Sequence, residues 1–125
     1  MAKKRFHYLI ADRDSIHPGD DIVGHVRKWK ISGNETIIDI ASTLLTDYLP
    51  WNPPKRTETW ILVCNNLDLA LLQQSWETPK YFIRTDEEVS RYFNGSGDFV
   101  LFLKLLWKDR ENYFHSHGIV ESQLR

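Results

Sequence analysis

Two histidines late in the sequence have the residue type and spacing that acid–base or metal chemistry requires. His115 and His117 are separated by one serine, and residues two apart on a β-strand point to the same face. Two imidazoles on one face could share a metal ion or a phosphate group. A zinc site needs at least a third ligand, and no further motif with metal-ligand spacing accompanies the pair. We therefore expect no bound metal and no cofactor.

Arg110 and Lys104 could add positive charge to these histidines, as ribonuclease chemistry requires. The Arg-x4-His spacing from Arg110 to His115 resembles the HEPN ribonucleases, in which the arginine binds phosphate and the histidine assists transfer from the ribose 2′-OH. The His-Ser-His string resembles the core of the JAMM/MPN metalloproteases, but that family needs a serine and then an aspartate downstream, and no aspartate follows Ser122 here. One hypothesis is thus a small metal-independent ribonuclease or phosphodiesterase that uses His115, His117, Arg110 and Lys104.

Short motifs that mark well-known active sites are missing from the sequence. It has no Gly-rich phosphate loop before a helix, no GxSxG elbow and no HExxH. The single cysteine, Cys64, falls in a predicted buried strand, where a thiol is inert. Asp12, Asp14, Asp20 and Asp21 cluster after the first predicted strand, but a polar loop and a helix N-terminus ordinarily contain such residues. We therefore expect a chain without catalysis.

Aromatic and acidic side chains point instead to a binding surface. Aromatic residues make up 13% of the sequence, and three of them lie at predicted element boundaries, where rings are more often exposed. Exposed Trp and Tyr are frequent anchors of protein interfaces. An acidic run in a predicted capping box adds negative charge. The predicted partner-binding residues are Tyr48, Trp51, Trp76, Asp86, Glu87 and Glu88.

Charge is nearly balanced overall but uneven along the chain. Sixteen Lys and Arg oppose 17 Asp and Glu, which gives a net charge of -1 and is unlike a dedicated nucleic-acid binder. Residues 1–31 sum to +3, residues 32–98 to -5 and residues 99–125 to +1. An acidic middle segment would speed the encounter with a basic partner. We expect a protein partner such as a basic toxin or nuclease, and no direct contact with nucleic acid.

Length and composition fit a single globular domain over residues 1–125. With 42% hydrophobic and 26% charged residues, the chain is unlike disordered proteins. No apolar run approaches 18 residues, and the first residues lack a signal-peptide pattern. We expect a cytoplasmic protein that does not contact a membrane.

Hydrophobic patterns and capping signals predict strands and helices along the chain. A capping box at 32–35, followed by apolar residues with a 3.6-residue period, predicts the clearest helix, which Pro50 ends. β-Branched and aromatic residues over 57–64 favour a buried strand. The run 99–107 is nearly continuous apolar, so a central strand and a buried helix both fit it. The turn residues before and after it favour a strand, paired in a hairpin with 113–120.

The resulting order, β-α-α-β-α-β-α-β-β, predicts an α+β fold with a mixed sheet of about five strands and three to four helices packed on it. A three-layer α/β sandwich is the alternative. The expected strands are 6–11, 57–64, 81–84, 99–107 and 113–120, and the expected helices are 20–31, 37–48, 67–76 and 85–94.

These features favour a small cytoplasmic protein-binding module. The class that fits is an immunity protein, antitoxin or other inhibitor that neutralises a toxin or nuclease by occluding its active site. Such proteins are short and lack catalytic motifs, and an acidic surface would cover a basic active site. The ribonuclease hypothesis on the two histidines is the alternative.

Overall fold

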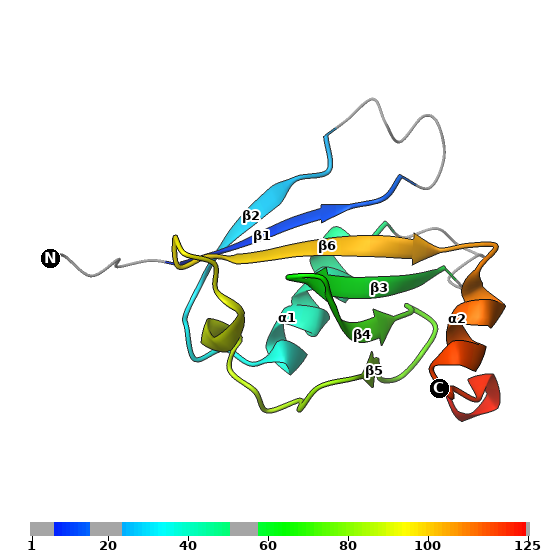
Figure 1. Ribbon diagram of the computed structural model, residues 1–125. Helices are drawn as coiled ribbons and strands as arrows, with labels where there is room; N and C mark the ends of the chain where they lie inside the picture. The colour runs from blue at the N-terminus through cyan, green and yellow to red at the C-terminus, as the bar shows by residue number, and fades with distance from the viewer. Residues whose placement is uncertain (1–6, 16–23, 51–57, 125) are drawn as a thin grey trace, which may run out of the picture.

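The fold is built on one mixed β-sheet whose strands are not in chain order. The computed structural model describes residues 7–15, 24–50 and 58–124. Six strands hydrogen-bond in the order β2-β1-β6-β3-β4-β5, with β1 and β6 parallel and the other neighbours antiparallel (Figure 1). The strands are β1 (His7–Arg13), β2 (Arg27–Ile31), β3 (Thr59–Cys64), β4 (Leu67–Leu72), β5 (Lys80–Tyr81) and β6 (Phe99–Leu106).

Helical segments in the described ranges are short. The two α-helices pack against the sheet, α1 on one face and α2 at the end of β6 on the other (Figure 1). A π-helical turn continues α1 directly, and two 3-10 turns lie before β6 and after α2. These segments are α1 (Ile37–Thr43), η2 (Leu44–Tyr48), η3 (Val89–Tyr92), α2 (Arg110–Ser116) and η4 (Glu121–Gln123).

Most of the buried apolar residues lie between α1 and the sheet. Successive turns of α1 and η2 bury Ile37, Ala41 and Leu44, as the 3.6-residue apolar period predicts. From the sheet, Leu62 of β3 and Leu103 of β6 are fully buried in the same cluster. A smaller cluster on the opposite face joins Phe114 of α2 to residues of three strands. Its buried members are Ile61, Leu71, Leu106 and Phe114.

The α+β class and the mixed sheet are confirmed. The strands expected at 6–11, 57–64 and 99–107 appear as β1, β3 and β6, and the helix expected at 37–48 appears as α1 and η2. The sheet has six strands rather than about five, and the described residues hold two α-helices rather than three to four. Helices lie on both faces, but α2 covers only one end of its face, so the second helical layer is partial.

The helix predicted over 67–76 is wrong, because Leu67–Leu72 forms strand β4. Asn65 and Asn66 both have positive φ, 52° and 64°, and asparagine tolerates this left-handed region better than most residues. Two such residues make a tight turn that favours a hairpin between β3 and β4. The apolar run is therefore the buried partner of β3 rather than one side of a helix.

The helix predicted over 20–31 is also wrong in its described part, since Arg27–Ile31 is strand β2. Lys28 and Lys30 alternate with the partly buried Trp29 and Ile31, which is the two-residue period of an edge strand with one buried side. Long-range pairing with β1 stabilises this strand.

Three more expected elements differ near the end of the chain. The strand at 113–120 is wrong because α2 occupies this region, where Phe114 turns inward onto the sheet. The helix at 85–94 is reduced to the single turn η3, and the strand at 81–84 to the two-residue strand β5. The parallel pair joins β1 to β6, which are far apart in sequence.

Candidate functional site

Residues 84–91, which we call the acid loop, hold the predicted partner-binding carboxylates Asp86, Glu87 and Glu88. Three backbone hydrogen bonds of 2.8–3.2 Å join this loop to residues 33–37, which lead into α1. The shortest of them runs from the Val89 N–H to the Glu35 carbonyl. The backbone of the acid loop is therefore fixed beside the first turn of α1.

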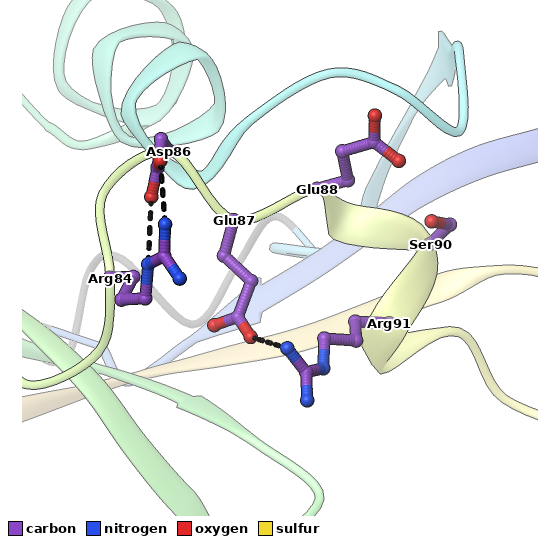
Figure 2. Close-up of a pocket in the computed structure, with 6 residues that line it drawn as sticks. All are labelled: Arg84, Asp86, Glu87, Glu88, Ser90 and Arg91. Atoms are coloured by element: carbon purple, nitrogen blue, oxygen red, sulfur yellow. Dashed lines mark hydrogen bonds and ion pairs between the residues drawn. The ribbon is translucent and has the colours of Figure 1, made fainter.

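Two arginines neutralise part of the negative charge in the acid loop. Arg84 donates to both carboxylate oxygens of Asp86, at 3.2 and 3.0 Å, and Arg91 lies 2.6 Å from Glu87 (Figure 2). The Arg84 guanidinium holds the pKa of Asp86 below its usual range. Glu88 points away from both ion pairs (Figure 2). The five charged side chains sum to -1, so the loop carries a mild negative charge.

A shallow pocket of about 290 Å³ lies over this loop, lined by the five charged side chains and Ser90 (Figure 2). Tyr92 of η3 donates its hydroxyl hydrogen to Glu87, one of the lining residues, at 2.7 Å. Burial, together with the neighbouring Glu87, raises the pKa of Tyr92 to about 12. Tyr92 therefore remains a hydrogen-bond donor at neutral pH and holds the Glu87 carboxylate in place.

An apolar groove of about 270 Å³ runs along the exposed side of α1. One wall carries Ile38 of α1 and Leu45 of η2, and the other carries Pro79, just before β5, and Tyr81 of β5. Ile38 is 46% exposed, so this wall of the groove is in contact with solvent. Glu77, at the rim of the groove, adds a carboxylate.

The groove and the acid loop adjoin at the start of α1. The N–H of Ile37 donates to the Glu87 carbonyl at 3.2 Å, and Ile38 is the next residue along the helix. Tyr81, on the facing wall, is three residues before Arg84. We call the groove and the adjoining acid loop together the α1 surface: the groove is mainly apolar and is lined by one carboxylate, Glu77, and the acid loop carries three more.

Of the three predicted aromatic anchors, none lines the pockets of the α1 surface among the residues described. The expectation that Tyr48 is exposed is wrong: it is 8% exposed, packs edge-on to Trp29 and donates its hydroxyl hydrogen to the His25 carbonyl at 2.5 Å. Trp76 is partly buried against the smaller core, on the α2 side of the sheet. Trp51 lies outside the described residues. A role for these rings in partner binding stays a prediction.

The structure does not arrange the four residues of the ribonuclease hypothesis as a strand pair would. His115 and His117 follow one another along and just beyond α2, where residues two apart do not share a face. His117 stacks on Tyr113 with ring centroids 3.9 Å apart. Arg110 is bound by structural partners, and Lys104 projects from β6. Whether any of them acts in catalysis stays untested.

Cys64 is buried in β3, and its thiol lies 3.8 Å from the Tyr92 carbonyl. Burial raises the pKa of this thiol from 9.0 to about 11. Only the thiolate attacks disulfides and alkylating agents, so the folded protein presents about 100-fold less thiolate at pH 8 than the unfolded chain. Cys64 is thus a poor nucleophile in the native state.

We expect native Cys64 to react with a thiol reagent at pH 8 at least about 100-fold more slowly than in the urea-unfolded chain. Because the folded pKa lies above the unfolded value, the stability conferred by the neutral thiol is full below pH 9 and is lost as the pH approaches 11. The free energy of unfolding, measured with urea at pH 9 and at pH 11, should fall less between these two pH values for Cys64→Ala than for the wild type. Rapid labelling of Cys64 in the native protein would contradict this prediction. So would an equal fall in the free energy of unfolding in the variant and the wild type.

Other types of site and outside relatives give no further guide to function. No three His, Cys, Asp or Glu side chains in residues 7–15, 24–50 and 58–124 gather closely enough to hold a metal ion. None of the helices in those ranges has the length and apolar character needed to cross a membrane. Comparisons with protein-family models, curated proteins and solved structures found no match. The functional argument therefore rests on the surface itself.

Sequence reasoning missed the residues that line the groove. Ile38 and Leu45 are seven residues apart and form a second apolar stripe beside Ile37 and Leu44, and the apolar period of the helix does not show that this stripe faces away from the core. This second apolar stripe is a signal that the sequence does contain. The opposite wall, at Pro79 and Tyr81, depends on the β4–β5 hairpin, which the sequence analysis did not predict.

Proposed function

We propose that this chain is a small cytoplasmic protein-binding module without catalysis, which inhibits a basic partner such as a toxin or nuclease by occluding its active site. The observation that carries the proposal is the α1 surface, in which an exposed apolar groove adjoins the acid loop. The assignment to immunity proteins or antitoxins is the narrower form of this proposal. It rests on the size and charge of the chain and on the absence of known catalytic motifs from its sequence.

The groove has the composition of the centre of a protein interface. Ile38, Leu45, Pro79 and Tyr81 leave apolar surface open to solvent, and burial of such surface contributes about 25 cal/mol per Å². Interfaces place apolar and aromatic side chains at the centre and polar side chains at the rim. A partner side chain in this groove would remove Ile38 from water.

Charge around the groove favours a basic partner. Glu77 lines the groove and Glu88 lines the pocket over the adjoining acid loop, and the surrounding segment 32–98 carries a net charge of -5. Complementary charge raises association rates and disfavours acidic competitors. Because these carboxylates are at the rim, salt should weaken the complex mainly through slower association.

The test is affinity capture with the tagged full chain from extract of its native cell, followed by an inhibition assay on the captured protein. We expect to capture one stoichiometric basic partner at about 0.1 M salt. Much less of this partner should be captured at about 0.5 M salt, because the distance over which exposed charges interact falls as ionic strength rises. Adding the chain back in equimolar amount should abolish the activity of the partner. Ile38→Gln, or Glu77→Gln with Glu88→Gln, should weaken binding by about tenfold, equivalent to about 1.4 kcal/mol.

Two matched controls place the interface. Val120→Gln changes an exposed aliphatic residue outside the groove, and Glu111→Gln changes an exposed carboxylate on α2. Both variants should bind like the wild type. Capture that is equally weak in the controls, or a partner whose activity is unaffected by the chain, would overturn the proposal.

A further inference from the structure

Among residues 7–15, 24–50 and 58–124, no helix covers one face of the sheet over most of its length. α1 covers the opposite face, and α2 lies on this face near the end of β6 (Figure 1). The strand register places Ile10 of β1 beside Val100 of β6, and Phe102 beside Val63 of β3. Tyr8 lies two residues before Ile10, on the same side of β1. We call this surface, centred on Tyr8, Ile10, Val100 and Phe102, the open face.

Two apolar side chains at the centre of the open face are exposed, and Tyr8 and Ile10 beside them are partly buried. Val100 is 43% and Phe102 is 38% exposed, although both lie on β6, a central strand of the sheet. Their neighbours Leu101 and Leu103 point to the other face and are buried. Exposed apolar side chains gathered on one surface are typical of a binding site.

Three lysines border this apolar centre. The register sets Lys30 beside Tyr8 and Lys28 beside Ile10, and Lys104 follows Phe102 by two residues on β6. Lysines on an edge strand such as β2 also prevent pairing with other chains, but Lys104 is on a central strand, where that role does not apply. Asp12 lies on the same face and opposes part of this charge.

The net charge of -1 does not describe the open face. Its three lysines come from strands β2 and β6, whereas the α1 surface comes from segment 32–98, which sums to -5. The total charge is therefore a poor guide to either surface.

We propose that the open face binds single-stranded nucleic acid, with Phe102 and Tyr8 as stacking platforms and Lys28, Lys30 and Lys104 as phosphate contacts. Single strands are bound by aromatic side chains that stack on bases together with cations that follow the backbone. Exposed rings on a β-sheet offer such a platform. This site lies beyond the proposed protein-binding function, and it reverses the expectation of no nucleic acid, which rested on total charge.

Unpaired bases are the part of the ligand that distinguishes this proposal from general polyanion binding. In a duplex the bases are stacked inside, so only phosphates would reach a flat sheet, and the rings would contribute little. An acidic protein surface would satisfy the lysines but would not require a flat ring at position 102. Phe102 is therefore the residue whose loss separates these ligands.

The test is fluorescence anisotropy of labelled 12-nucleotide oligo(U) and oligo(dT) with the full chain. Three phosphate contacts on a single strand predict a slope of about -2 in a log–log plot of affinity against salt, or about 20-fold weaker binding at 200 mM than at 50 mM salt. Phe102→Ala should weaken binding at least about fivefold, from the loss of stacking. The triple variant Lys28→Gln, Lys30→Gln and Lys104→Gln should bring the slope of affinity against salt close to zero.

Lys80→Gln, an exposed lysine on the opposite edge strand β5, is the matched control and should bind like the wild type. If Phe102→Ala fails to fold, the lysine variants still decide the question, because these side chains are exposed. Absence of binding at 50 mM salt would overturn the proposal. So would unchanged binding in the open-face variants, or equal competition by duplex DNA or by polyglutamate, the latter indicating an acidic protein ligand.

Discussion

Arg110→Ala is expected to lower the free energy of unfolding by about 2–4 kcal/mol. The Arg110 guanidinium donates to Thr59 Oγ1 at 2.9 Å and to Gln73 Oε1 at 3.3 Å, and both of these residues are buried. Without Arg110, the buried Thr59 and Gln73 oxygens lose their charged hydrogen-bond donor. This loss lowers the free energy of unfolding more than the loss of an exposed ion pair would. Arg110 also lies over the Phe114 ring at 4.6 Å, so its loss should loosen α2.

The control for this prediction is Glu121→Gln. Arg110 lies 2.5 Å from Glu121, but the Glu121 side chain is largely exposed, so breaking this ion pair should cost about 1 kcal/mol or less. Urea unfolding of both variants measures the difference. If Arg110→Ala unfolds like the wild type, Arg110 is not a structural residue, and the ribonuclease hypothesis, which needs it to bind phosphate, would regain support.

The strands that the sequence predicted correctly are those in which local pattern and tertiary environment agree. Over 59–64, β-branched and aromatic residues form a strand buried on both faces, with Trp60 and Leu62 in the larger core and Ile61 in the smaller one. The apolar run 99–106 became β6, which exposes Val100 and Phe102. An all-apolar run does not reveal which of its faces is covered.

The elements predicted wrongly are short amphipathic segments that long-range pairing decides. Leu67–Leu72 and Arg27–Ile31 each show apolar residues at spacings that fit a helix, but they pair with β3 and β1. In 110–116 the opposite happened: the segment follows β6 and folds back as a helix whose Phe114 packs onto the sheet. Differences in helix or strand propensity of a few tenths of a kcal/mol per residue are smaller than the free energy of such pairing and packing.

The candidate site was predictable in its charges but only partly in their compensation. The three carboxylates at 86–88 are visible in the sequence, and the Glu87–Arg91 pair has the i,i+4 spacing that the predicted helix would also bring together. The pairing of Asp86 with Arg84 depends on the loop geometry, because residues two apart do not face each other on a helix. The groove beside Ile38 requires two walls from distant segments. The open face was hidden for the same reason, because β2, β1 and β6 meet only in the folded sheet.

Neighbouring positions on β6 should respond in opposite ways to the same substitution. Leu103→Lys is expected to cost about 4 kcal/mol or more and to unfold much of the protein, because Leu103 is fully buried between β3 and β1 and an unpaired ammonium there has no partner. Phe102→Lys, one residue earlier, should cost about 1 kcal/mol or less, because its side chain points to the open face. Thermal unfolding followed by circular dichroism measures both.

This pair of substitutions tests the open face independently of any ligand. If Phe102→Lys destabilises the protein as much as Leu103→Lys, the face is covered in solution, for example by a second copy of the chain, and its rings are not available to bases. If it is tolerated, Phe102 contributes little to folding and its exposure requires another reason. An exposed phenylalanine on a central strand then lowers solubility without stabilising the fold. We infer that Phe102 is exposed because it binds a ligand.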